Sequence, residues 1–334
     1  MPKVSIVTPT FQHARFIDAC AESVLAQTER DWEMVVVDDG STDATADRAA
    51  AFADPRIRVI RREHEGFAGL GTAYNLAIGV SSGPIVAVLE GDDTWPQDKL
   101  ARQLEAFGDP AVVLAYGRAE LIDGSGRTFA EYAWRPRGRM GLNDPVGAIL
   151  PVLARGNFIV APTVMIRRSA LERIGGFWQP PSIPFVDHPT WMRLALEGRF
   201  AFSDAVVGRW RRHARQFSTS AVLEPPMRSL DYVDELAALA ASRGLAHVPR
   251  AARPDAATIR ARALIGEARL ALIAGEWGAA RHAFLEVLRT APTGPRIAIA
   301  AVGVTSSLAH RDIEWLFRAA GRLSWPGSLY TDAR

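Results

Sequence analysis

The sequence is poor in cysteine and lysine. It contains one cysteine, Cys20, so neither an internal disulfide nor a cysteine-rich zinc site can form. Its only lysines are Lys3 and Lys99, and arginine supplies the remaining basic side chains. Because arginine replaces lysine throughout, an arginine cluster in this chain is weak evidence for a phosphate site.

The chain also lacks a long apolar run. No stretch approaches the roughly 18 to 20 apolar residues that cross a bilayer, and the opening MPKVSIVTPT is typical of a strand rather than of a secretion signal. Hydrophobic residues make up 48% of the 334 residues, which is enough core for one large domain and a smaller one. We therefore expect a globular, cytoplasmic protein.

The formal net charge of +2 is unevenly distributed. Residues 241–334 hold 13 Arg against 7 Asp or Glu, and they are rich in alanine. Two interpretations stay open for this region: a solvated helix face, or peripheral association with acidic lipid headgroups at a membrane. We expect no nucleic-acid partner.

The first 120 residues alternate between short β-branched runs and amphipathic stretches. Strands are expected at residues 4–8, 34–37, 57–60 and 85–89, and helices at residues 14–27, 43–52, 72–80 and 97–107. This alternation predicts an α/β fold with a doubly wound, mostly parallel sheet that has helices on both faces.

A second region follows with a different composition. Three strand-like runs, VVLAYG, FIVAPTVMI and FAFSDAVV, and two helices at residues 168–174 and 189–197 complete the first domain. After Pro225-Pro226 the composition shifts to Ala, Arg and Leu with helical spacing, so we expect domains at residues 1–222 and 223–334. AGEWGAARHAFLEVLRTAP matches half of one tetratricopeptide repeat, and a solenoid needs about three, so we expect only an all-helical appendage. This appendage is a candidate for protein contacts.

Polar clusters follow three of the predicted strands, where ligands of such sheets bind. They are Thr8-Pro9-Thr10-Phe11, Asp38-Asp39-Gly40-Ser41 and Glu90-Gly91-Asp92-Asp93. Helix capping by Ser41 or Thr42 is the alternative for the second cluster, but two acids exceed what a cap needs. Carboxylates at a strand end suit a nucleobase N–H or ribose hydroxyls.

The third cluster places three carboxylates within four residues, and they repel one another unless water, a proton or a cation intervenes. Capping of the next helix explains Asp92 or Asp93. It does not explain Glu90, which in extended backbone points to the same side as Asp92. Two such oxygens suit a divalent cation, Mg²⁺ or Mn²⁺, that takes its other ligands from water and phosphate.

Five segments resemble a known family. VSIVTPTFQ, VVVDDGSTD, AYNLAIGVSSGPIVAVLEGDDTW, RRSALERIGGFW and VDHPTWMRLALEG occur in the order and spacing of the family 2 glycosyltransferases, inverting enzymes of the GT-A fold. The resemblance covers residues 3 to about 220. It implies a sugar transfer from a nucleoside-diphosphate sugar donor to a hydroxyl of a saccharide or lipid-linked saccharide acceptor, in cell-surface polysaccharide, lipopolysaccharide or glycoconjugate synthesis at the inner face of the membrane.

The resemblance also implies residue roles. Contacts to the nucleotide sugar fall on Thr8, Pro9, Thr10, Phe11, Asp38, Asp39, Glu90, Asp93 and Arg211. Asp92 and His213 stand in the places of metal ligands, and Asp187 stands in the place of the catalytic base. The alternatives are helix capping for Asp187 and a surface or core position for His213. His13, His64 and His188 receive no role.

Three departures from the family pattern leave the donor undetermined: Glu90 replaces Asp, Tyr74 replaces Arg, and Val186 replaces Glu. The Gln-x-x-Arg-Trp signature of processive members is missing, so one sugar per encounter is expected. Two other functions stay open. One is a sugar-nucleotide-forming nucleotidyltransferase, although TPTFQHARF lacks the glycine of its phosphate loop, and the other is a non-catalytic GT-A-like scaffold that binds a partner.

Overall fold

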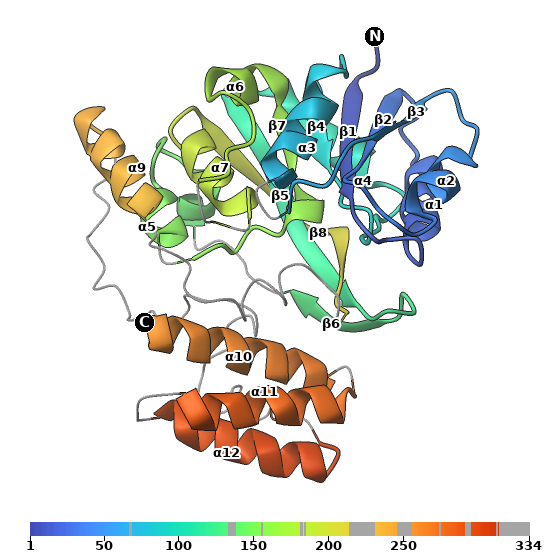
Figure 1. Cartoon of the computed structure of the whole chain (residues 1–334). Coiled ribbons are helices and arrows are strands. Elements are labelled where there is room, and N and C mark those ends of the chain that lie inside the picture. Colours follow the sequence, from blue (N-terminus) through green and yellow to red (C-terminus); the bar gives the residue numbers. More distant parts are fainter. Residues whose placement is uncertain are drawn as a thin grey trace.

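The protein is described here from a computed structural model. It describes residues 1–66, 69–132, 138–154, 156–180, 183, 185–213, 231–245, 256–273, 275–290, 295–311 and 313. Figure 1 shows an α/β domain built on one sheet and, below it, a stack of three helices from the end of the chain.

The first half of the sheet is parallel, as the alternating pattern predicts. Its strands are β1 (Val4–Thr10), β2 (Trp32–Asp38), β3 (Ile57–Arg61) and β4 (Ile85–Val88), in the order β3-β2-β1-β4. The connecting helices are α1 (Ile17–Leu25), α2 (Thr45–Ala50) and α3 (Gly69–Gly79). In register, Thr10 lies beside Asp38 and Val7 beside Val88, so the three strands end at one edge.

The second half of the sheet is mixed. β4 pairs antiparallel with β7 (Met165–Arg167), β7 with β5 (Val112–Ile122), and β5 with β6 (Thr128–Tyr132), whereas β8 (Arg199–Arg211) runs parallel to β5. Short helices in this part of the chain include η2 (Glu105–Gly108), η3 (Gly138–Leu142) and α5 (Leu150–Leu153). The doubly wound α/β prediction is thus confirmed, with an antiparallel centre.

One strand prediction is largely wrong. Most of FIVAPTVMI is irregular or forms the 3-10 helix η4 (Ala161–Thr163), and only its last two residues enter β7. Pro162 has no N–H for a strand ladder. Its carbonyl accepts a hydrogen bond from Trp95 Nε1 at 2.8 Å instead, and Thr163 Oγ1 donates back to Val160 O at 2.7 Å.

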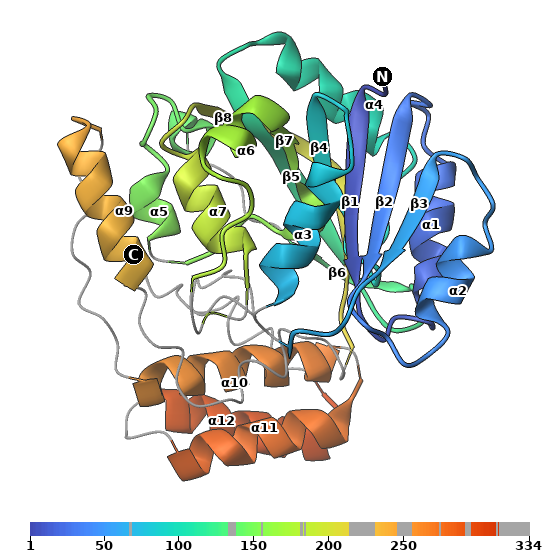
Figure 2. The ribbon, with the colours of Figure 1, turned by 45° about the horizontal axis from the view of Figure 1, so that its top comes forward.

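Helices cover both faces of the sheet (Figure 2). The helices α3, α6 (Arg168–Arg173) and α7 (Asp187–Leu194) share a core with Val7, Val35 and Val37. On the other face α1 and α4 (Lys99–Leu104) pack on Ile6 and Val36. Because side chains alternate along a strand, β1 and β2 are buried on both faces, which explains their near-continuous apolar sequence.

The helical end of the chain divides between two cores. α9 (Asp231–Ser242) packs on the α/β domain, where the buried Tyr232 hydroxyl and His188 Nδ1 lie 2.6 Å apart and Leu236 joins the core. The helices α10 (Ala256–Ile273), α11 (Trp277–Thr290) and α12 (Pro295–Leu308) form a core around Phe284. The expected boundary after residue 222 lies outside the described residues and stays a prediction.

None of the helices in the described part of the chain combines the length and apolarity needed to cross a bilayer.

The docking of α9 makes a stability prediction with an internal control. Leu236 is 4% exposed and Leu239, on the same helix, is 38% exposed. We expect Leu236→Ala to lower the free energy of unfolding by about 2–4 kcal/mol, because it leaves a cavity in the core. Leu239→Ala should cost less than about 1 kcal/mol. Denaturant unfolding measures both, and equal effects would contradict the docking of α9.

Candidate active site

The acidic cluster is fastened to the end of β1 by main-chain hydrogen bonds. Leu89 N donates to Val7 O at 3.2 Å, and Gly91 N donates to Pro9 O at 3.1 Å. Position 91 is occupied by glycine because the chain passes close to Thr10 there: a Cβ at this position would lie 2.4 Å from Thr10 Oγ1. The residue between the two acids therefore has to be small, so that both carboxylates stand over the strand ends.

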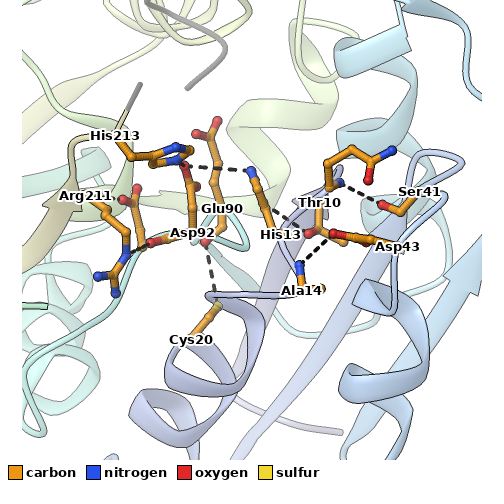
Figure 3. Close-up of polar contacts among 12 residues, drawn as sticks. Thr10, His13, Ala14, Cys20, Ser41, Asp43, Glu90, Asp92, Arg211 and His213 are labelled. Carbon is orange, nitrogen blue, oxygen red and sulfur yellow. Dashed lines mark hydrogen bonds and ion pairs between the residues drawn. The ribbon is translucent and has the colours of Figure 1, made fainter. Parts of the chain in front are cut away.

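Asp92 lies between two histidines (Figure 3). Its Oδ2 accepts a hydrogen bond from His213 Nε2 at 3.1 Å and lies 3.8 Å from His13 Nε2. His13 Nδ1 is in turn 3.1 Å from Thr10 Oγ1. Burial alone would raise the pKa of Asp92, but the two histidines outweigh it and lower the pKa to about 2. The carboxylate is therefore ionised at neutral pH.

The residues present fit a divalent metal ion. Ligand atoms of His13, Asp92 and His213 lie within 4.8 Å of one another, and so do those of Glu90, Asp92 and Asp93. In the described part of the chain, Asp93 Oδ2 is buried without a hydrogen-bond partner. A cation would offset this concentration of carboxylates, and a set of one carboxylate and two imidazoles accepts first-row divalent metals.

Sequence reasoning missed His13. The sequence offers one indication of a role for His13, which is its position three residues after Thr10 at the carboxyl end of β1. Position alone does not show that the ring turns toward Asp92, 79 places further along the chain. His213, in contrast, was predicted as a metal ligand, and it lies beside Asp92.

Glu90 and Asp93, the other two acids of the cluster, have different surroundings. Tyr74 hydroxyl donates to Glu90 Oε1 at 2.9 Å, and burial, reinforced by the charge of Asp92, raises the pKa of Glu90 to about 8. Asp93 is fully buried and its Oδ1 accepts the main-chain N–H of Arg211 at 2.7 Å. Asp93 thereby fastens the end of β8 to the acidic loop, and its predicted donor contact stays a prediction.

Arg211 points away from the carboxylate of Asp92 (Figure 3). Its Nε donates to the main-chain oxygen of Asp92 at 2.6 Å, and its Nη1 donates to Asp123 O at 2.9 Å. The guanidinium also lies over the Phe16 ring, 4.9 Å from the centroid. Arg211 therefore braces the acidic loop in this structure, and its phosphate contact stays a prediction.

The ends of β1 and β2 bring together a second group of polar and aromatic side chains. Thr8, Pro9 and Thr10 are buried, whereas Phe11 is 37% exposed and its ring stacks on His64 at 4.1 Å between centroids. Two further contacts orient the acids there: His64 Nδ1 lies 2.8 Å from Asp39 Oδ2, and Asp38 Oδ2 accepts Ser41 N at 3.2 Å. His64, which received no role from the sequence, thus joins the predicted pair of acids.

Asp187 is the first residue of α7, whose N-cap is Val186, and no side-chain cap hydrogen bond is present there. The carboxylate instead accepts a hydrogen bond from Asn157 Nδ2. Burial raises the pKa of Asp187 to about 6, against the opposing effect of the His188 N–H and the Asn157 amide. Burial raises the pKa of Tyr74 and of Glu90, and the charge of Asp187 adds to that effect, so Asp187 lies within electrostatic range of the acidic cluster.

The fold and this arrangement of strand ends define a GT-A glycosyltransferase. The family model for glycosyl transferase family 2 matches residues 5–175, which is half of the chain. The protein therefore belongs to the family 2 glycosyltransferases, as the five sequence segments indicated.

Curated relatives and a solved structure agree with this family. The chain is 30% identical over 203 residues, 60% of its length, to a putative teichuronic acid biosynthesis glycosyltransferase, TuaG, of Bacillus subtilis. It is 36% identical over 121 residues, 36% of its length, to a UDP-Glc:alpha-D-GlcNAc-diphosphoundecaprenol beta-1,3-glucosyltransferase, WfgD, of Escherichia coli. The aligned segments span 75% and 47% of these two proteins.

The solved structure is that of a mannosyltransferase, PcManGT, of Pyrobaculum calidifontis in complex with GDP-Man and Mn²⁺. It matches with a TM-score of 0.53 and 19% sequence identity, and the match covers 97% of this chain and 85% of that one. At this identity the match shows a shared fold.

The close approach at Gly91 can be tested by overpacking. We expect Gly91→Ala to lower the free energy of unfolding by about 1–3 kcal/mol, because the added methyl meets Thr10 and separates the ends of β1 and β4. Gly108→Ala is the matched control, since no atom lies within 4 Å of a Cβ built there. Thermal unfolding compares the two variants, and a silent Gly91→Ala would contradict the packing of this edge.

Proposed function

We propose that this protein is an inverting, metal-dependent and non-processive glycosyltransferase that moves one sugar from a nucleoside-diphosphate sugar to an acceptor hydroxyl. The observation that supports it most is the ionised Asp92 between His13 and His213 at the strand ends. A second carboxylate, Asp187, lies within electrostatic range of this cluster, and its pKa is raised rather than lowered. A carboxyl group with a lowered pKa suits a metal ligand, and one with a raised pKa suits a proton acceptor.

In this mechanism Asp92, His213 and His13 would hold the metal ion. When bound, a divalent cation offsets the negative charge that develops on the phosphates of the departing nucleoside diphosphate. Asp38, Asp39 and the stacked rings of Phe11 and His64 would hold the nucleoside, because carboxylates accept base and ribose hydrogen bonds and an aromatic face packs on a base.

Asp187 would act as the general base. It removes the proton of the acceptor hydroxyl while that oxygen attacks the anomeric carbon, and the bond from this carbon to the diphosphate breaks on the opposite face. The proton ends on Asp187 and the bonding electrons leave with the diphosphate, so the anomeric configuration inverts. The hydrogen bond from Asn157 orients the carboxylate for this step.

The donor and acceptor are proposed as classes. A relative's name specifies UDP-Glc and a diphosphoundecaprenol acceptor, and that of the structural neighbour specifies GDP-Man, so the base and the sugar differ among similar proteins. We propose a saccharide or lipid-linked saccharide acceptor, and a role in bacterial cell-surface polysaccharide synthesis at the cytoplasmic side of the membrane. Family membership disfavours the nucleotidyltransferase alternative, and turnover of donor would exclude a non-catalytic scaffold.

Metal binding is tested at Asp92. We expect Asp92→Asn to weaken Mn²⁺ binding by more than about 100-fold, beyond the roughly 10- to 100-fold that loss of an outer-shell partner costs. Titration of Mn²⁺ followed by electron paramagnetic resonance measures this affinity. Asp98→Asn, which removes an acid paired with Arg102 on α4, should leave the affinity unchanged. If Asp92→Asn and the parent bound Mn²⁺ with equal affinity, the assignment of Asp92 as a metal ligand would be wrong.

The base is tested by rate, pH and stability together. Nucleoside diphosphate release from a panel of UDP- and GDP-sugars should fall by about 10² to 10⁴-fold in Asp187→Asn. In the parent the rate should fall as the pH drops below about 6, where Asp187 takes up a proton.

The same substitution, Asp187→Asn, should leave the stability of the fold unchanged or raise it. The folded pKa of Asp187 lies above its ordinary value, so at pH 7 the ionised carboxylate destabilises the fold, and a neutral amide removes that cost. Asp187→Asn should therefore melt at the parent temperature or above it. A near-normal rate combined with a lower melting temperature would indicate a structural residue instead.

A further inference from the structure

The end of β8 connects the site to the helical stack. In Figures 1 and 2, α10 is the helix of the stack nearest to the α/β domain. Arg212 Nη2 donates to both carboxylate oxygens of Glu267 on α10, at 2.8 Å each. Arg212 is 7% exposed, and its guanidinium also lies over the Trp210 ring, 4.6 Å from the centroid. This is a partly buried contact between the two cores.

Arg212 stands between two residues of the site. Its main-chain N–H donates to Ile122 O at 2.8 Å, so the backbone is still paired with β5 at this point. In extended backbone successive side chains alternate in direction. Arg211 and His213 accordingly reach Asp92 on one side, at 2.6 and 3.1 Å, while Arg212 reaches α10 on the other.

We propose that Glu267 is a positioning residue for the metal site: by holding Arg212, it keeps Arg211 and His213 directed at the acidic cluster. This rests on the metal site proposed above. The physical reason is that Glu267 supplies two charge-assisted hydrogen bonds to a buried guanidinium, and their loss weakens the hold on the strand end that carries His213. The helical stack thereby becomes part of the metal-binding unit, although it contributes no ligand.

The first measurement is Mn²⁺ affinity of the full chain. We expect Glu267→Gln to weaken Mn²⁺ binding by about three- to tenfold, at or below the range for residues that orient a metal ligand. Glu286→Gln is the matched control, because Glu286 forms an ion pair with Arg289 within α11, away from β8. Glu267→Asp, which keeps the charge, should retain part of the affinity and guards against a variant that fails to fold.

A double-mutant cycle separates positioning from general support. If Glu267 acts through His213, then Glu267→Gln should have no further effect on Mn²⁺ affinity in a His213→Ala background. Additive losses in the double variant would overturn the proposal.

The second measurement needs no metal. Amide hydrogen exchange at Arg211 and Arg212 should be faster in Glu267→Gln than in Glu286→Gln, because these two N–H groups hold the strand end to Asp93 and Ile122. Unchanged exchange would overturn the positioning role whatever the metal titration gives. If Asp92→Asn binds Mn²⁺ as the parent does, the metal assignment fails, and the exchange experiment still decides whether Glu267 orders β8.

Discussion

The site depends on the pairing of β1 with β4. Two main-chain hydrogen bonds, from Leu89 to Val7 and from Gly91 to Pro9, hold the acidic loop over the end of β1. They bring Asp92 next to His13 and leave no space for a side chain at Gly91. Without this register the carboxylates would follow a strand end but would face no histidine.

The electrostatic contrast between carboxylates follows from what surrounds each one. Asp92 is buried and Asp187 is partly buried, and desolvation raises the pKa of each. Two histidines reverse that effect at Asp92, whereas Asp187 has the Asn157 amide and the main-chain N–H groups of His188 and Asp187, which are too weak to do so. Different neighbours thus lower the pKa of one carboxyl to about 2 and leave that of the other at about 6.

The end of β8 gathers parts of the chain that are far apart. Arg211 binds the acidic loop from 119 residues away, His213 reaches Asp92 across 121 residues, and Arg212 reaches Glu267 across 55 residues. Alternation of side chains along this short stretch divides its contacts between the site and the helical stack. The α/β domain and the stack therefore share one strand end rather than meeting only through a linker.

The sequence by itself determined the alternation of strands and helices, the helical end of the chain and the polar clusters, because periodicity and turn chemistry are local. Parallel strands bring their carboxyl ends together, so the sequence pattern alone predicts Asp38, Asp39, Glu90 and Asp92 at one edge. Only the tertiary structure decided which partners those residues meet. His13, His64, Asn157 and Glu267 are contacts across long stretches of chain, and the docking of α9 depends on the complementary face of α7, so no local pattern encodes them.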